Sequence, residues 1–545
     1  MMYTARRDFL KLAGVGIASL SFGGLLASCS SGSSSSAGSK SSEAGDQVII
    51  AMNTGSEPAA GFDPLISWGA GEHVHEPLIQ STLITTNADM SFGLDLATSY
   101  DCSDDGMRWT FTLRDDVTFS DGEPVTADDA AFTIRGILNS EGSEIDLSMI
   151  KDAHAEDAHT LVIDMEKPYN ALLYTLAVVG IVPEHAYSES YGRSPIGSGR
   201  YLLEQWDEGQ QIILVANPDY YGEAPRMKKV IVVFMEEDAA LAAVRSGEID
   251  IAFTSSAFSN QEVEGFELLA CETVDSRGIS LPMGPTGSLR ADGSVEYPAG
   301  NEVTRDEGLR KAMNYALDRE AMVTNVLNGY GSPAYSVCDG MPWATEDMKV
   351  DTNREKAQQI LDEAGWKKNS EGILEKEGQL AAFTLVYSAG DSTRQALATE
   401  FSNQMSELGI SVKTEGLSWD DIYPRQFSDP ILWGWGSNSP TELYELNYSS
   451  GWGNFSGYNS PTSDAYFDEA LATPEIADSY DLWHKAQWDG KSGPAPQGEA
   501  SWVWLVNVDH LYFKRKGLDV AEQKPHPHGH GWSLVNNVDR WSWDA

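Results

Sequence analysis

The class of fold is decided by Val230-Ile-Val-Val-Phe234, then Asp238-Ala-Ala-Leu-Ala-Ala-Val-Arg-Ser246, then Ile249-Asp-Ile-Ala-Phe253. The first and last segments are short apolar runs rich in β-branched residues, which predict buried strands. The middle segment has the composition of a helix, and Gly247 predicts its end. The three segments together predict a βαβ unit, with parallel strands and a right-handed crossover.

A second unit of the same kind lies far downstream. Residues 383–387 predict a strand, 392–408 a helix with apolar residues at helical spacing, and 410–414 another strand. Further helix patterns, at 306–328 and 354–364, lie between the two units. Two separate βαβ units predict two α/β lobes. The polar, Gly-rich stretches 284–301 and 492–499 are candidates for the chain's crossings between lobes.

Three shorter patterns add detail. Residues 109–113 predict a strand, and Thr126 with Asp129 predicts a capping box at the start of a helix. Trp502-Val-Trp-Leu-Val506 is apolar throughout and predicts a buried strand.

The N-terminus carries an export signal. Arg6 and Arg7 precede an apolar run over 12–26, which ends in Leu26-Ala-Ser-Cys29 and a serine tract. About 15 apolar residues are too few for a helix that crosses a bilayer, which needs about 20. Residues 30–45 are nearly all Ser, Gly and Ala, and cannot bury enough apolar surface to fold. The pattern predicts a removed signal, a tether and a folded body outside the cytoplasm.

Chain length, net charge and cysteine count limit the number of domains, the possible partners and the disulfides. A chain of 545 residues exceeds what one hydrophobic core normally holds, so two or three domains are expected. Without residues 1–28 the chain has 34 basic and 81 acidic residues, a formal charge of −47. Such a surface repels nucleic acid and anionic lipid. With Cys29 used as a lipid site, Cys102, Cys271 and Cys338 allow at most one disulfide.

Three further segments carry a recognisable pattern. They are Arg108-Trp-Thr-Phe-Thr-Leu-Arg114 with Asp121-Gly-Glu-Pro-Val-Thr-Ala-Asp-Asp129, Pro195-Ile-Gly-Ser-Gly-Arg-Tyr201 with Asn217-Pro-Asp-Tyr-Tyr221, and Ser246-Gly-Glu-Ile-Asp-Ile-Ala252. In this order and spacing they resemble the family 5 extracytoplasmic solute-binding proteins, the peptide, nickel and opine type of ABC importer. The N-terminus likewise resembles a twin-arginine lipoprotein signal, whose Cys29 receives lipid.

The resemblance implies a two-lobed periplasmic-binding-protein-like α/β fold with an extra domain, which closes around a ligand at a hinge. The implied division is a signal peptide at 1–28, a tether at 29–45, domain I at 46–90, 197–285 and 500–545, domain II at 91–196, and domain III at 286–499. It also implies a lipid-anchored monomer in the periplasm or on the cell surface, with permease and ATPase subunits as partners and no required cofactor.

Peptide-binding members of that family hold the ligand's α-amine with an aspartate that follows a tryptophan. Here Ser437 and Asn438 stand at that place after Trp435, and a neutral amide stabilises an ammonium less than a carboxylate does. Aromatic residues in Gly- and Ser-rich surroundings can form a cleft wall or belong to the core. The candidate ligand-binding residues are Trp419, Trp433, Trp435, Asn438, Tyr444 and Trp452.

Histidines form two groups. Pro525-His-Pro-His-Gly-His530 places three imidazoles within five residues, and His73 and His75 form a second pair. Imidazole suits nickel, zinc and copper, so His73, His75, His526, His528 and His530 are candidate metal ligands. A structural role is equally open, because proline on both sides favours a geometry that splays residues two apart.

The leading function is therefore capture of a small solute for an ABC permease, with a short peptide or peptide-like compound as first choice. Nickel or another transition metal, bare or chelated, is the alternative cargo, followed by an oligosaccharide. A secreted metallohydrolase is disfavoured, because the sequence has no His-Glu-x-x-His helix and no Gly-x-Ser-x-Gly elbow. An adhesin or chaperone that reuses the scaffold remains a third class.

Overall fold

The computed structural model describes residues 45–68, 75–140, 142–293, 295–529 and 531–544. The predicted signal, the lipid site at Cys29 and most of the tether lie outside these residues. No helix of the described part is long and apolar enough to span a bilayer. Cys102, Cys271 and Cys338 are all free thiols, so the permitted disulfide does not form.

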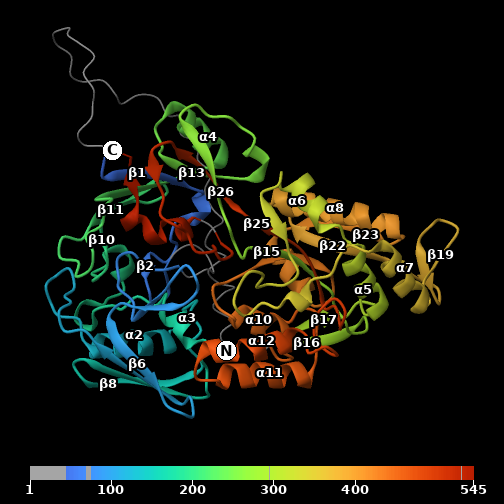
Figure 1. Cartoon of the computed structure of the whole chain (residues 1–545), viewed down its shortest axis with the longest axis horizontal. Coiled ribbons are helices and arrows are strands. Elements are labelled where there is room, and N and C mark those ends of the chain that lie inside the picture. The colour runs from blue at the N-terminus through green and yellow to red at the C-terminus, as the bar shows by residue number, and fades with distance from the viewer. Residues whose placement is uncertain (1–44, 69–74, 141, 294, 530, 545) are drawn as a thin grey trace, which may run out of the picture.

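The first sheet has seven strands and forms the upper left of the molecule (Figure 1). Its middle strand, β1, pairs in parallel with β12 on one side and β13 on the other. The predicted βαβ unit is therefore present, but β1 is inserted between its two strands. The order is β10 (Tyr201–Asp207), β11 (Gln211–Ala216), β12 (Lys229–Phe234), β1 (Gln47–Met52), β13 (Ile251–Thr254), β26 (His510–Arg515) and β14 (Phe266–Cys271), with helix α4 (Glu237–Ser246) between β12 and β13 in the chain.

The second sheet has six strands and lies in the other half of the molecule (Figure 1). The predicted downstream unit is confirmed, since β22 pairs directly and in parallel with β23. The order is β18 (Gly331–Pro333), β25 (Trp502–Val508), β15 (Ser276–Ser280), β24 (Ile431–Trp435), β22 (Ala382–Ser388) and β23 (Ser411–Leu417). The nearby helices are α5 (Glu307–Ala316), α6 (Arg319–Val326), α7 (Arg354–Glu363), α8 (Ser392–Leu408), α9 (Trp419–Ile422), α10 (Thr441–Asn447), α11 (Pro461–Ala472) and α12 (Tyr480–Gln487).

One predicted helix is in fact two. The pattern over 306–328 breaks at Leu317 and Asp318, where Asp318 caps α6 by accepting from the N–H of Ala321. At this break, Oε1 of Gln404 accepts a hydrogen bond from the backbone N–H of Asp318. Neither Gly nor Pro marks the position, so the interruption depends on a tertiary contact.

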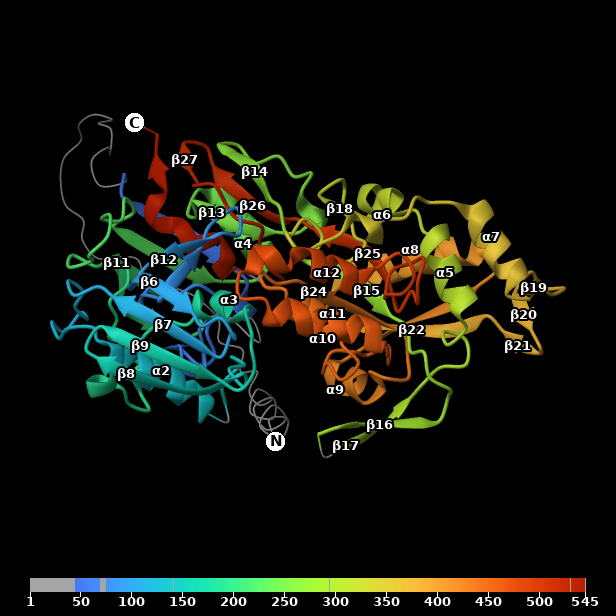
Figure 2. The same ribbon diagram turned by 60° about the horizontal axis from the view of Figure 1, so that its bottom comes forward.

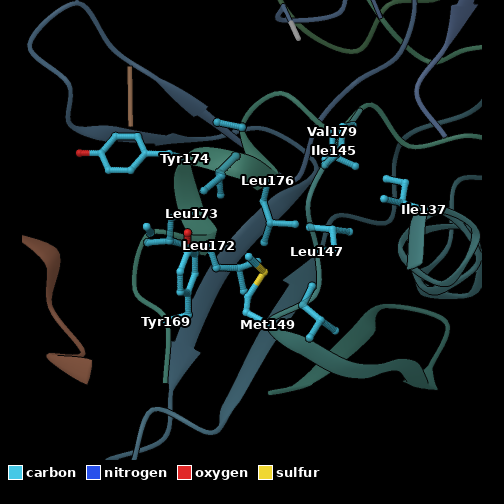
Figure 3. Close-up of a cluster of buried hydrophobic side chains, with 14 of the residues drawn as sticks. Ile137, Ile145, Leu147, Met149, Tyr169, Leu172, Leu173, Tyr174, Leu176 and Val179 are labelled. Atoms are coloured by element: carbon cyan, nitrogen blue, oxygen red, sulfur yellow. The ribbon is translucent and has the colours of Figure 1, made fainter. Parts of the chain in front are cut away.

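The third sheet has four antiparallel strands and covers the lower left of Figure 1. The predicted capping box is present, since Oδ2 of Asp129 accepts from both the backbone N–H and the hydroxyl of Thr126. Figure 3 shows part of the core here, where α3 side chains such as Leu172 and Leu176 lie near Leu147 and Met149. The elements are β6 (Ala97–Cys102), β7 (Arg108–Leu113), β9 (Thr160–Met165), β8 (Ile150–Asp157), α2 (Ala127–Leu138) and α3 (Leu172–Leu176).

The remaining strands form small ribbons. One hairpin, of β16 and β17, projects from the body (Figure 2). The ribbons are β2 (Phe62–Asp63) with β3 (Ser67–Trp68), β4 (Ile84–Thr86) with β5 (Phe92–Leu94), β16 (Ser288–Asp292) with β17 (Val295–Ala299), β19 (Lys367–Lys368) with β20 (Leu374–Lys376) and β21 (Gln379–Leu380), and β27 (Leu518–Asp519) with β28 (Ser542–Trp543).

The chain passes between the first two sheets at places other than those predicted. It leaves β14 for β15 through 272–275, and it leaves β25 for β26 through Asp509. The stretch 284–301 instead holds the β16–β17 hairpin, and 492–499 is a loop before β25. Strands β15 and β25, which the predicted boundaries gave to domain I, therefore belong to the six-stranded sheet. The other predicted boundaries stay a prediction.

Candidate functional site

The carboxyl ends of three parallel strands meet where the six-stranded sheet faces the two linkers. After β22 the chain enters α8, after β23 it enters α9 at Trp419, and after β24 it continues through residues 436–440 into α10. In open α/β sheets, ligands bind outside the carboxyl ends of the strands. We therefore take the end of β24 and its surroundings as the candidate site.

The segment 525–528, which we call the strap, bridges the two sheets. On one side the N–H of Val274 donates to the carbonyl of His526, and the N–H of His526 donates to the carbonyl of Glu272, at 2.9 and 3.0 Å. On the other side, the N–H of His528 donates to the carbonyl of Gly436 at 2.7 Å. The strap thus binds the 272–275 linker and the end of β24 together.

Asp275, in the linker, is the centre of a buried charge network. Its carboxylate, which is 1% exposed, contacts both terminal nitrogens of Arg277, Nδ1 of His528 and Nε2 of His510. Burial alone would raise the pKa of Asp275, but the charges of Arg277 and His528 hold it well below the usual range. Asp275 is therefore an ionised anchor at the junction of the two sheets.

His526 has the environment of a structural histidine. Its side chain is fully buried, its Nδ1 lies 3.2 Å from Nδ1 of His510, and its Nε2 lies 3.2 Å from Oε1 of Gln523. Burial first, and then the charges of His510 and His75, hold the pKa of His526 well below 6.5. The imidazole is therefore neutral at physiological pH.

The other candidate metal ligands are only partly brought together. His75 is buried and its Nδ1 lies 3.3 Å from Oγ of Ser533, whereas His528 faces Asp275. His73 and His530 lie outside the described residues. Within the described ranges, no three His, Cys, Asp or Glu side chains form a group that could hold a metal ion.

The predicted aromatic residues form one continuous wall on β24 and its neighbours. The ring of Trp433 stacks on the rings of Phe455 and Trp419, with centroid distances of 4.3 and 5.7 Å. Its Nε1 donates a hydrogen bond to Oγ of Ser280. Trp433 is 4% exposed and forms the base of the wall. Trp435 packs edge-on against Trp452 at 5.5 Å, and Trp452 is 39% exposed.

Two more candidates lie beside this wall. Nδ2 of Asn438 donates to the carbonyl of Pro525 at 3.0 Å, so this amide holds the strap. Tyr444 stacks on Tyr448 at 4.5 Å, and the ammonium of Lys167 lies 5.8 Å from its ring centre.

Two arginines that the sequence analysis did not single out converge on Gly434. A Cβ at this glycine would lie 2.6 Å from Nη2 of Arg394 and 2.9 Å from Nη1 of Arg277. Both side chains are at least nine-tenths buried, and the Nε atom of each has no hydrogen-bond partner among the described residues. Burial, and then the charge of Arg277, lower the pKa of Arg394 to about 10.

Two carboxylates on α10 were also missed. Oε2 of Glu442 accepts the N–H of Gly436 at 2.6 Å, and Oε2 of Glu445 accepts the N–H of Trp452 at 3.1 Å. Burial raises the pKa of each carboxyl to about 7. The charge of Lys167 partly offsets this effect at Glu445, whereas no cation among the described residues does so at Glu442. No sequence pattern separates these glutamates from exposed ones, because their burial comes from elements distant in the chain.

A separate cavity of about 470 Å³ is lined mainly by residues from 76–95, 199–226 and 522–540. Four of its charged side chains form ion pairs within the protein, Arg200 with Asp539 at 2.7 Å and Lys524 with Glu76. The aromatic wall contributes nothing to its lining. We keep the end of β24 as the candidate site because three buried donors without a partner in the described residues gather there: Nε of Arg277, Nε of Arg394 and Nε1 of Trp435.

Comparison with known proteins gives a consistent result. The family model described as bacterial extracellular solute-binding proteins, family 5 middle, matches residues 92–457. Protein XP55 of Streptomyces lividans is 32% identical over 494 residues, covering 86% of this chain and 85% of that protein. The oligopeptide-binding protein AppA of Bacillus subtilis is 29% identical over 457 residues, covering 78% and 80%. Among solved structures, NikZ from Campylobacter jejuni in complex with Ni(L-His) aligns with a TM-score of 0.72 and 25% identity, over 91% of this chain and 99% of that one.

Proposed function

Because this chain belongs to the bacterial extracellular solute-binding proteins of family 5, the substrate-binding components of ABC importers, we propose that its cargo is a short peptide or peptide-like solute. The protein binds this cargo at the end of β24, beside the aromatic wall, and delivers it to a membrane permease. The observation that carries the proposal is the set of buried, unpartnered donors at that place: Nε of Arg277, Nε of Arg394 and Nε1 of Trp435. A polar ligand with several acceptor atoms satisfies such donors, whose isolation is otherwise costly.

The site residues fall into two roles in this proposal. Trp419, Trp435, Tyr444 and Trp452 line the ligand, whereas Trp433 supports them from beneath and Asn438 holds the strap against the site. Closure requires only that the ligand contacts both sides and so favours the closed state. No bond of the cargo is altered, and no cofactor takes part.

The location of the protein follows the same proposal. A signal over residues 1–28 directs export, and lipid on Cys29 anchors a monomer in the periplasm or at the cell surface. The Ser-rich segment 30–45 then allows a distance of at most roughly 50 Å between the lipid site and the folded body, at about 3.3 Å per residue.

A thermal-shift screen of the purified protein tests the cargo. We expect a mixture of di- to tetrapeptides to raise the melting temperature, because a ligand at 100 times its Kd adds about 2.7 kcal/mol to the free energy of unfolding. A Trp435→Ala variant should lose most of this shift, while Trp206→Ala, on a strand of the other sheet, should keep it. No shift with peptides, together with a shift from an oligosaccharide mixture, would contradict the proposed cargo.

Nickel remains a second candidate because the NikZ structure, similar over nearly the whole chain, holds Ni(L-His). Calorimetry with nickel, with and without L-histidine, on the protein and on a His526→Ala, His528→Ala, His530→Ala variant tests it. A His154→Ala variant, on β8, is the matched control. Equal binding by all three proteins would remove His526, His528 and His530 from consideration.

A further inference from the structure

The four-stranded sheet touches the half of the molecule that holds the six-stranded sheet, although the chain does not lead directly from one to the other. The chain reaches the four-stranded sheet from β1 by way of the β2–β5 ribbons and leaves it for β10, so both connections lead to the seven-stranded sheet. The six-stranded sheet is joined to the seven-stranded one through 272–275 and Asp509. A rotation about these two linkers therefore makes or breaks any contact between the four-stranded sheet and helices α10 to α12.

One asparagine makes most of the polar contact across this junction. Asn170, which is 2% exposed, lies just before α3 and reaches the last turn of α11. Its Nδ2 donates to the carbonyls of Ala470 and Thr473, at 2.9 and 2.8 Å. Its backbone N–H donates to the carbonyl of Leu471 at 2.9 Å. A single residue beside the four-stranded sheet thus binds three carbonyls at the end of a helix in the other half.

The C-terminus of α11 has few donors of its own. The last four carbonyls of a helix have no partner within the helix. The last turn of α11 has no basic residue, and the helix ends at Thr473 in an extended conformation, without a glycine cap. Pro474 follows and has no N–H to donate. The N–H groups of Asn170 therefore complement the negative end of the helix dipole, and water must replace them when the halves separate.

Two aromatic residues extend the contact, and we call the segment 169–174 the clasp. The hydroxyl of Tyr169 lies 3.1 Å from Oγ1 of Thr441, the first residue of α10. The ring of Tyr174 packs edge-on against Trp343 with a centroid distance of 5.3 Å, and both side chains are buried. Figure 3 shows this ring pointing away from Leu176. Opening would expose these aromatic surfaces as well as the carbonyls of α11.

We propose that Asn170 is a positioning residue for closure: by capping α11 across the junction, it stabilises the closed state and so prolongs retention of the cargo. A contact made in one state only shifts the equilibrium toward that state. Losing two buried hydrogen bonds shifts such an equilibrium roughly tenfold to a hundredfold. The inference rests on the proposed import function for its cargo, whereas the clasp itself can be tested without a ligand.

Hydrogen exchange at the backbone amide of residue 170 measures the opening, because this N–H donates to Leu471 of the other half. At pH 8, Asn170→Ala should speed exchange roughly tenfold to a hundredfold. Asn170→Asp should speed it further, because it keeps the size of the side chain but turns a carboxylate toward the carbonyls of α11. Asn139→Ala is the matched control, since Nδ2 of Asn139 caps the carbonyl of Arg135 in its own helix α2. This control should leave exchange at residue 170 unchanged.

The order of the two variants separates hydrogen bonding from packing. Exchange in Asn170→Ala that equals or exceeds that in Asn170→Asp would show that lost volume weakens the contact, and would overturn the inference. The wild-type protein tests the clasp even if a variant fails to fold. Its amide at residue 170 should exchange at least about tenfold faster than the amides of β9, which serve as the reference for global unfolding. Equal rates would mean that the clasp opens only on unfolding, which overturns the proposal.

The cargo arm adds the di- to tetrapeptide mixture to the wild-type protein, and exchange at residue 170 should slow roughly tenfold or more. If the peptides raise the melting temperature without slowing this exchange, the clasp inference fails while the import function stands. If the variants behave as expected but neither peptides, nickel nor an oligosaccharide mixture changes the exchange or the melting temperature, the clasp stands and the proposed function fails.

Discussion

The Glu442→Gln substitution should stabilise the ligand-free protein, increasingly as the pH rises above about 4.5 and fully above about 7. In the folded chain, burial raises the pKa of this carboxyl from 4.5 to about 7. The folded state therefore holds the proton more tightly than the unfolded state. The free energy of unfolding therefore falls as pH rises from about 4.5 to about 7, and it stays lower by the full amount above that range.

The size of this stabilisation follows from the change in the pKa of Glu442 on folding. A difference of about 2.5 pKa units corresponds to about 3.4 kcal/mol. The side chain is only half-buried by its surface, so water reduces this figure, and we expect about 2 kcal/mol at pH 8. At pH 5 the folded carboxyl is already protonated, and the effect shrinks to below about 1 kcal/mol. Glutamine keeps an oxygen that can accept the N–H of Gly436.

Urea unfolding followed by tryptophan fluorescence, at pH 5 and pH 8, measures the effect on wild type and variant. The urea midpoint of Glu442→Gln should lie above that of wild type at pH 8 and close to it at pH 5. The exposed Glu469→Gln should change neither midpoint. A variant that is less stable at pH 8, or equally shifted at both pH values, would refute the argument that Glu442 is a half-buried carboxylate without a compensating cation.

Three further predictions concern the packing around the site. Gly436→Ala should destabilise the protein by roughly 2 kcal/mol or more, because a Cβ there would lie 1.7 Å from the carbonyl oxygen of Val274, at a φ of +145°. Thermal unfolding should show no such loss for the control Gly390→Ala, whose added Cβ meets no atom within 4 Å. Trp433→Ala should cost about 3–5 kcal/mol in urea unfolding, since the stacked ring is 4% exposed, and a loss under 1 kcal/mol would contradict its role as the base of the wall. Arg200→Gln should cost about 2 kcal/mol in urea unfolding, because the half-buried carboxylate of Asp539 then keeps only the exposed Arg540, at 3.9 Å, and Asp539→Asn should restore part of the loss.

Local patterns were sufficient for most elements of the fold. The helix over 392–408 has the predicted bounds, because Asp391 caps it, apolar residues follow the helical period, and Gly409 ends it at a positive φ. The capping box at Thr126 and the buried strand from Trp502 are equally local in origin. Such signals lie within a few residues of the structure that they specify.

The errors came from contacts between distant segments. The break at Asp318 depends on Gln404, and the insertion of β1 between β12 and β13 depends on a strand from the start of the folded chain. The crossing points were misplaced because Gly-rich composition marks any exposed turn, including the β16–β17 hairpin. The linker itself is short and held by the strap, and only its second half, Val274 and Asp275, is buried.

The sequence by itself determined the family pattern and the two βαβ units, and it predicted the aromatic residues of the candidate site, because each of these patterns lies in neighbouring residues. Only the tertiary structure decided that Arg394 and Glu442 flank the end of β24, that Asn438 serves the strap, and that His526 is buried and neutral. Burial and pairing set the charge and reach of a polar side chain. Both depend on segments that the chain brings together only when it folds.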